Sequence, residues 1–155
     1  MVLLLDQVLA QSGSAWHGLP RPDLDRERTG PTRSSVTVLV VEDDEQAREL
    51  TARILRDEGY NVFAVNSGEQ ALECLAGGRD VQVILADIAM PGGMDGFELA
   101  DRILAIAPWQ RVVLMSGFAP QFPELDTARF PLLIKPFSPD QLARRIREVL
   151  EGKLH

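Results

Sequence analysis

The chain has 155 residues, of which 45% are hydrophobic, and this is enough for one domain with its own core but too little for two. Its 23 Asp and Glu residues outnumber 16 Lys and Arg residues, which gives a formal net charge of -7. A nucleic-acid surface requires clustered basic side chains, so we expect no direct contact with DNA or RNA. Cys74 is a single cysteine without an internal disulfide partner, which indicates a reduced thiol and a reducing compartment.

The first 35 residues are predicted to form an arm or linker ahead of the folded domain. Residues 2–10 are apolar enough for a short helix, although a frayed terminus explains them equally well, and residues 11–35 are rich in Ser, Gly, Pro and Arg. The start of the chain lacks the basic residues of a secretory signal, and no stretch reaches the about 20 apolar residues of a membrane span. We therefore expect a cytoplasmic protein without membrane contact, with its domain at residues 36–151.

From residue 36 onward, short runs of β-branched residues alternate with longer stretches of helical spacing. This alternation is typical of a parallel sheet that is covered by helices on both faces. Strands are expected at residues 37–41, 61–65, 81–86, 111–115 and 132–134. The pattern therefore predicts an α/β domain with five strands.

Helical spacing follows the first three predicted strands and the last one. Four apolar residues of the first stretch are expected to line its buried face: Ala47, Leu50, Ile54 and Leu55. The last helix has a clear start, with Ser138 as N-cap and Gln141 closing a capping box. Three prolines within residues 118–131 leave room for only a short helix near residues 124–129, so the fourth helix is expected to be irregular or shortened.

Groups suited to phosphoryl chemistry follow four of the five predicted strands. They are Glu42, Asp43 and Asp44 after the first strand, Asp87 after the third, Ser116 after the fourth and Lys135 after the fifth. In doubly wound sheets, functional groups gather at the carboxyl ends of strands, near the point where the strand order reverses. If the order is 2-1-3-4-5, the carboxylates of Glu42, Asp43 and Asp87 lie close together. Because such like charges repel, we expect a divalent cation to offset them.

The predicted ligands indicate which cation this is. Carboxylate oxygens with a backbone carbonyl suit Mg²⁺ or Mn²⁺, whereas zinc prefers His and Cys side chains. Asp87 is then placed to attack a phosphoryl group in line, while Lys135 and Ser116 hold the phosphoryl oxygens. Two residues also have simpler interpretations, since Asp44 is suited to cap the helix that begins at Glu45 and Lys135 to serve as an ion-pair partner.

Five short strings together resemble the receiver domains of two-component response regulators. They are Val38-Leu39-Val40-Val41-Glu42-Asp43-Asp44, Asp87-Ile88-Ala89-Met90-Pro91, Met94-Asp95-Gly96, Leu114-Met115-Ser116-Gly117 and Ile134-Lys135-Pro136-Phe137. The resemblance covers residues 36–150. It implies a flavodoxin-like (βα)5 three-layer sandwich with a parallel sheet of order 2-1-3-4-5. It also implies dependence on Mg²⁺ and transfer of a phosphoryl group from a histidine kinase or histidine phosphotransfer protein.

The resemblance also implies a role for each site residue. The metal site comprises Glu42, Asp43, Asp87 and the backbone carbonyl of Ala89. The groups that touch the phosphoryl group are Asp87, Ser116 and Lys135. Asp87 is then the phosphoacceptor, and Asp43 rather than Glu42 is the direct metal ligand of the acidic pocket. The Lys135-Pro136 bond is expected to be cis, against a general frequency of about 5% for such bonds.

The sequence departs from the family's pattern at two places. The turn at residues 91–96 looks one residue longer than the common form. Leu132 stands in the fifth predicted strand where many members carry a switching Tyr or Phe, so the familiar aromatic switch is not expected here. Phe118, Phe122 or Phe130 are candidates to replace it, or they only pack beneath an irregular loop. How the signal is passed on is therefore left open.

Two alternatives stand beside the phosphoacceptor hypothesis. A haloacid-dehalogenase-like phosphatase also forms an aspartyl phosphate, but it needs a second acid two residues after the nucleophile, where this chain has Ala89. A degenerate receiver would act only as a protein-binding module. We expect a stand-alone receiver or one from a hybrid sensor kinase, which assists its own phosphorylation and is otherwise not an enzyme. Self-association through the N-terminal segment or the face of the last helix is a further candidate interaction.

Overall fold

A computed structural model describes residues 35–117 and 130–152 of the chain. Residues 1–34 of the predicted N-terminal arm, with the possible helix at residues 2–10, lie outside the described residues, and so does the short helix predicted near residues 124–129. Within the two described ranges, no helix is both long enough and apolar enough to cross a membrane.

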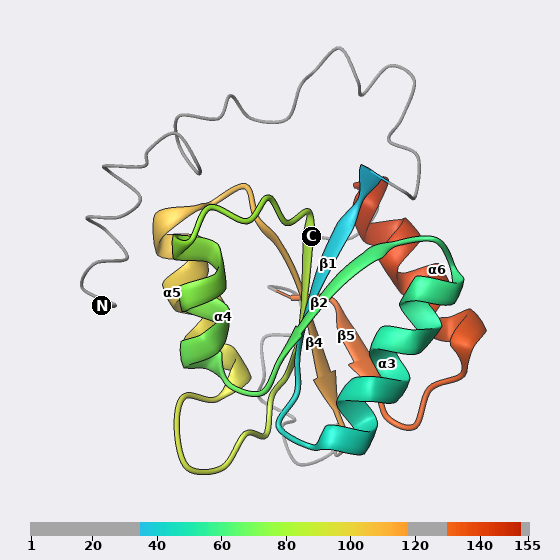
Figure 1. The fold of residues 1–155 in the computed structure, drawn as a ribbon, viewed down its shortest axis with the longest axis horizontal. Helices are drawn as coiled ribbons and strands as arrows, with labels where there is room; N and C mark the ends of the chain where they lie inside the picture. The colour runs from blue at the N-terminus through green and yellow to red at the C-terminus, as the bar shows by residue number, and fades with distance from the viewer. Residues whose placement is uncertain (1–34, 118–129, 153–155) are drawn as a thin grey trace.

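Five strands and four helices make up the described part of the chain (Figure 1). The strands are β1 (Thr37–Val41), β2 (Asn61–Val65), β3 (Val83–Asp87), β4 (Arg111–Ser116) and β5 (Leu132–Ile134). The helices are α3 (Glu45–Asp57), α4 (Gly68–Ala76), α5 (Gly96–Ile106) and α6 (Pro139–Leu150). The sheet is parallel throughout and has the order β2-β1-β3-β4-β5, which confirms the predicted flavodoxin-like topology.

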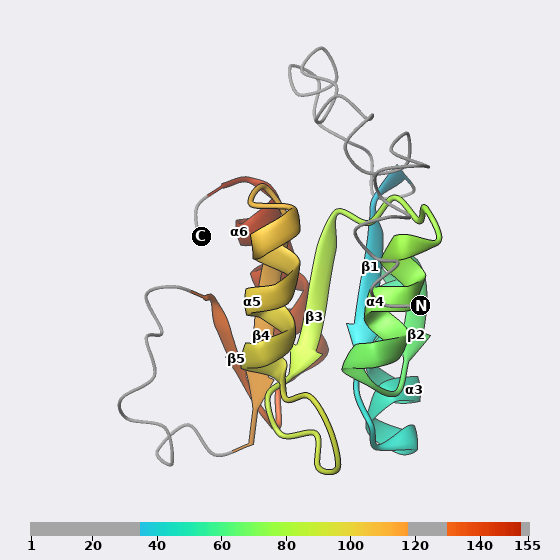
Figure 2. The same cartoon turned by 90° about the vertical axis from the view of Figure 1, so that its left-hand side faces the viewer.

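The helices cover the sheet in two layers. Helices α4 and α5 lie on one face and helices α3 and α6 on the other (Figure 1). Successive side chains of a strand point to opposite faces, so Val38 and Val40 of β1 pack in the cluster that contains Leu55 and Leu142, while Leu39 packs in the other. Figure 2 shows that the strands all run toward one edge. Polar side chains that follow the buried strands are therefore gathered at that edge.

Strand bounds follow the predictions closely. Strands β1, β2 and β5 have the predicted bounds, β4 continues one residue further to Ser116, and β3 covers Val83–Asp87 instead of residues 81–86. The capping box of α6 is confirmed, because the Ser138 hydroxyl accepts from the Gln141 amide at 3.1 Å while the Gln141 side chain accepts from the Ser138 amide at 2.8 Å. The Lys135-Pro136 bond is cis, as expected.

The predicted buried face of the first helix is partly wrong. Leu50 is 59% exposed, and the fully buried residues of α3 are Thr51, Ala52 and Leu55. At 100° per residue, Leu50 lies about 140° around the helix from Leu55 and so points away from the sheet. The side chains at positions 51 and 52 are small, so α3 can lie close to the sheet there. The prediction considered mainly large apolar residues and therefore missed this part of the buried face.

Candidate functional site

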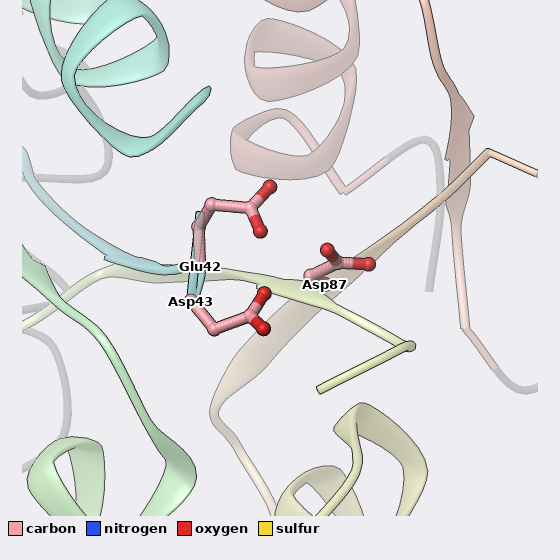
Figure 3. A group of neighbouring side chains, drawn as sticks. All are labelled: Glu42, Asp43 and Asp87. Atoms are coloured by element: carbon pink, nitrogen blue, oxygen red, sulfur yellow. The ribbon is translucent and has the colours of Figure 1, made fainter. Parts of the chain in front are cut away.

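The site begins where β1 and β3 end side by side. Val41 pairs with Ala86, so the chain leaves both strands at the same edge of the sheet. Glu42 and Asp43 follow β1, and Asp87 is the last residue of β3. These three residues each offer a carboxylate oxygen, and the three oxygens lie within 4.8 Å of one another. Figure 3 shows the carboxyl groups turned toward a common space.

The two acidic residues after β1 differ in their surroundings. Glu42 is buried, and its Oε1 contacts the Lys135 ammonium while its Oε2 accepts from the Asp44 amide at 3.3 Å. Asp43 is exposed. Protein groups therefore hold the carboxylate of Glu42, whereas the carboxylate of Asp43 can be reached from solvent.

Lys135 follows the edge strand β5 and connects this strand to the cluster. Its Nζ lies 3.0 Å from Oδ2 of Asp87 in addition to its contact with Glu42. Its backbone amide donates to the carbonyl of Ser116 at 2.8 Å, which continues the β4–β5 pairing beyond Ile134. Ser116 itself is buried at the end of β4. The structure thus brings the predicted residues of four strand ends to one edge.

Both oxygens of Asp87 are oriented by neighbours. Oδ1 accepts from the Ala89 amide at 3.1 Å, and Oδ2 faces Lys135. The contact that the structure records for Ala89 is thus made through its N–H. Its predicted role as a carbonyl ligand of a metal ion stays a prediction.

The charges of the cluster do not balance, since three carboxylates face one ammonium. Burial raises the pKa of Glu42 to about 7, and the neighbouring Asp87 adds to this rise while Lys135 opposes it. Burial alone would lower the pKa of Lys135, but its contacts with Glu42 and Asp87 outweigh this effect and raise it. A divalent cation at this edge would offset the remaining negative charge.

Two residues that support the site were not identified from the sequence as having this role. A Cβ atom on Gly96 would lie 2.5 Å from the carbonyl oxygen of Asp87, so a glycine is needed where the start of α5 passes beneath the end of β3. Arg48 of α3 donates from Nη1 to the carbonyl of Glu42 at 3.0 Å. The sequence feature that could have identified Arg48 is its position as a basic residue one helical turn after the N-cap Asp44.

The loop after β3 reaches back to the core. Gly92 has φ of +88°, a conformation that glycine adopts without strain. Met94 is buried and lies so close to α4 that a Cβ atom on Gly68 would be 3.0 Å from its sulfur. The loop that looks long in the sequence is therefore held against α4 by an apolar contact of Met94, shortly before α5 begins.

The position of the familiar aromatic switch is filled by the half-buried Leu132. Phe130 is buried, and its ring centroid lies 6.4 Å from that of Phe97 in α5, with the ring planes tilted by 58°. Phe130 thus serves as a packing residue between β5 and α5. The other two candidates, Phe118 and Phe122, lie outside the described residues.

Residues 38–147 match the model of the response regulator receiver domain family. The match covers more than half of the chain, and the chain belongs to this family. It confirms the resemblance inferred from the five sequence strings, and it sets aside the haloacid-dehalogenase-like phosphatase.

Similar proteins include kinases, regulators and solved receiver structures. Sensor kinase CckA of Brucella abortus is 36% identical over 131 residues, which cover 81% of this chain and 14% of CckA. Transcriptional regulatory protein TcrA of Mycobacterium tuberculosis is 34% identical over 130 residues, which cover 79% of this chain and 51% of TcrA. The response regulator TrrA of Thermotoga maritima, solved with Mg²⁺-BeF, superposes with a TM-score of 0.67 at 26% identity, covering 74% of this chain and 98% of TrrA. The chain thus spans about half of TcrA and a small part of CckA.

Replacing Gly96 by alanine tests the close approach of α5 to the end of β3. Gly96→Ala should lower the free energy of unfolding by about 1–3 kcal/mol, because the added methyl group displaces the backbone of Asp87. Gly77→Ala is the matched control, since its Cβ would meet the Glu73 carbonyl at an ordinary 3.4 Å. Urea unfolding followed by circular dichroism measures both, and equal stabilities would contradict the predicted crowding.

The raised pKa of Glu42 predicts how the stability of the metal-free protein changes with pH. Folded Glu42 binds its proton more tightly than the unfolded chain does, so the folded state should gain stability as the pH falls from 8 to 6. A pKa of about 7 makes this gain about 1 kcal/mol. Glu42→Gln should remove it. Urea unfolding with a chelator at both pH values is the measurement, and an unchanged pH dependence in the variant would refute the assignment to Glu42.

Proposed function

We propose that this receiver domain accepts a phosphoryl group on Asp87 from a histidine kinase or a histidine phosphotransfer protein, and that phosphorylation changes its binding to partners. The observation that carries this proposal is the meeting of Asp87 with Lys135 and two further carboxylates at one edge of the sheet. A half-buried lysine that contacts the acceptor carboxylate can also pair with a phosphoryl group on it.

The donor set of the cluster fits Mg²⁺ or Mn²⁺. Its three acidic side chains offer hard oxygen ligands, and the cluster includes neither His nor Cys. Asp43 and Asp87 would hold the ion directly, together with the carbonyl of Ala89, while Glu42 stays engaged with Lys135. When bound, the ion supplies positive charge that offsets the carboxylates and the phosphoryl oxygens. The Mg²⁺-BeF complex of TrrA supports the same ion for this chain.

In the proposed transfer, a carboxylate oxygen of Asp87 forms a P–O bond while the P–N bond to the donor's imidazole breaks. The imidazole keeps the electron pair of that bond and takes up a proton from water. The Ala89 amide and the Lys135 ammonium orient the two oxygens of Asp87 for this attack. Lys135 and the Ser116 hydroxyl would then hold phosphoryl oxygens, a role supported by the position of Ser116 at the end of the strand beside β3.

We further propose that residues 36–151 form the receiver domain and residues 1–35 an arm or linker. Buried Val36, just before β1, and the last turn of α6 at Leu150 support these bounds. Self-association, a cytoplasmic location and the absence of direct contact with nucleic acid stay predictions from the sequence. TcrA is described as a transcriptional regulatory protein, but this chain spans only about half of TcrA, so that role is not assigned to it.

Asp87→Asn should abolish phosphorylation and leave the fold intact, because the amide has the shape of the acid but is not a comparable nucleophile. Asp80→Asn is a control with the same chemical change at an exposed residue ahead of β3, away from the site. Intact-mass measurement after incubation with acetyl phosphate and Mg²⁺ detects the adduct. Adduct formation on Asp87→Asn would place the acceptor elsewhere. An unmodified parent would instead favour the degenerate receiver that acts only by binding proteins.

Asp43→Ala should remove the stabilisation of the fold by Mg²⁺. A ligand that binds only the folded state at 100 times its Kd stabilises it by about 2.7 kcal/mol, and Asp43 supplies an exposed ligand oxygen of the cluster. Asp44→Ser is the control, because serine removes a neighbouring charge but still caps α3. Melting temperatures across a Mg²⁺ titration are compared. If Asp43→Ala keeps the Mg²⁺ dependence of the parent, the metal site lies elsewhere.

A further inference from the structure

Arg48 contacts the backbone that carries the two acidic residues after β1. Its Nη1 donates to the carbonyl of Glu42 at 3.0 Å and makes a longer contact of 3.5 Å with the carbonyl of Asp43. We propose that Arg48 is a positioning residue that holds this turn so that Asp43 faces Asp87 at the metal site. The inference rests on the proposed function, since it concerns the same metal site.

The turn needs such a support because the sheet no longer provides it. The register of β1 ends at Val41, and the last backbone contact to β2 is the Glu42 amide donating to the Val65 carbonyl at 3.1 Å. The carbonyls of Glu42 and Asp43 therefore lie beyond the strand ladder. A change of the backbone dihedral angles at these two residues would swing the Asp43 carboxylate away from Asp87.

Arg48 is itself fixed to this turn. Its backbone amide donates to the carbonyl of Asp44 at 2.8 Å, and the Asp44 side chain accepts from the Ala47 amide at 2.8 Å. The guanidinium group thus reaches back from the first turns of α3 to the residues just before it. The backbone of Arg48 thus bonds to Asp44 and its side chain to Glu42, so both ends of this residue are tied to the turn after β1.

The direction in which the Mg²⁺ affinity changes when Arg48 is replaced distinguishes positioning from a purely electrostatic effect. The positive charge of Arg48 repels a divalent cation, so loss of the charge alone would tighten the binding of Mg²⁺. Loss of the contact with the turn would weaken the binding, because the ligands would have to be ordered when the ion binds. Lysine keeps the charge but lacks the planar set of donors, so it should restore the positioning only in part.

The test compares the Mg²⁺ affinities of Arg48→Met, Arg48→Lys and Arg56→Met with that of the parent protein. Methionine resembles the aliphatic part of the arginine side chain and has a similar helix propensity, but it has no charge and no donors. Arg56→Met is the matched control, because Arg56 lies in the last turn of the same helix and donates to the Val62 carbonyl at 3.4 Å, away from the site. Isothermal titration calorimetry gives the Kd of Mg²⁺, and melting with and without Mg²⁺ gives the increment that the ion adds.

We expect Arg48→Met to raise the Kd for Mg²⁺ roughly tenfold, which corresponds to about 1.4 kcal/mol. Arg48→Lys should show a smaller rise and Arg56→Met almost none. A residue that supports only the fold would lower the melting temperature of the metal-free protein and leave the Mg²⁺ increment unchanged. Equal or tighter Mg²⁺ binding in Arg48→Met than in Arg56→Met overturns the proposal.

Two further outcomes keep the test decisive. If Arg48→Met does not fold, Arg48→Lys carries the comparison, and a Kd equal to that of the parent overturns the proposal. If Asp43→Ala binds Mg²⁺ as the parent does, the proposed metal site fails, and this result is separate from any change at Arg48.

Discussion

Repulsion among three carboxylates at the ends of β1 and β3 is the interaction around which the site is built. Two like charges 4 Å apart in surroundings of intermediate dielectric repel by about 4 kcal/mol. The oxygens of Glu42, Asp43 and Asp87 lie within 4.8 Å of one another, and Lys135 is the ammonium that contacts two of these residues. A free loop would relieve the repulsion by moving apart. Here Asp87 ends β3 and Glu42 directly follows β1, and both strands are buried, so these two carboxylates cannot easily move apart. Asp43 lies one residue further from the strand ladder.

The two acidic residues after β1 differ in burial and in the groups that they face. Glu42 is buried against Lys135, and its raised pKa shows that its charged form is only partly stabilised there. Asp43 points from the same turn toward Asp87 and remains open to solvent (Figure 3). A cation that arrived from solvent would therefore meet Asp43 first, with Asp87 behind it. Glu42 meanwhile keeps the Lys135 ammonium beside Asp87.

The sequence was sufficient to predict the strands, because buried strands of a parallel sheet are short apolar runs with abrupt polar ends. The order of the sheet was expected from the resemblance to receiver domains. Residues such as Asp87 and Lys135 were found because they directly follow such runs. The predicted buried face of α3 was wrong at Leu50, since the face that packs is set by small side chains at the contact. Gly96 and Arg48 act on the backbone of residues elsewhere in the chain, and such contacts leave no periodic trace in the sequence. The segment between β4 and β5 lies largely outside the described residues, so the prediction of a short fourth helix stays a prediction.

One polar network ties together elements that lie far apart in the sequence. Lys135 joins the end of β5 to Glu42 after β1 and to Asp87 of β3, and its amide is bonded to Ser116 of β4. Arg48 adds α3 to the same network through the carbonyl of Glu42. Groups that share partners in this way do not contribute independently, because the removal of one leaves another buried and unpaired. The effect of any single substitution at this edge therefore measures the response of the whole network, and the contribution of one residue can be separated only by comparing single with double variants.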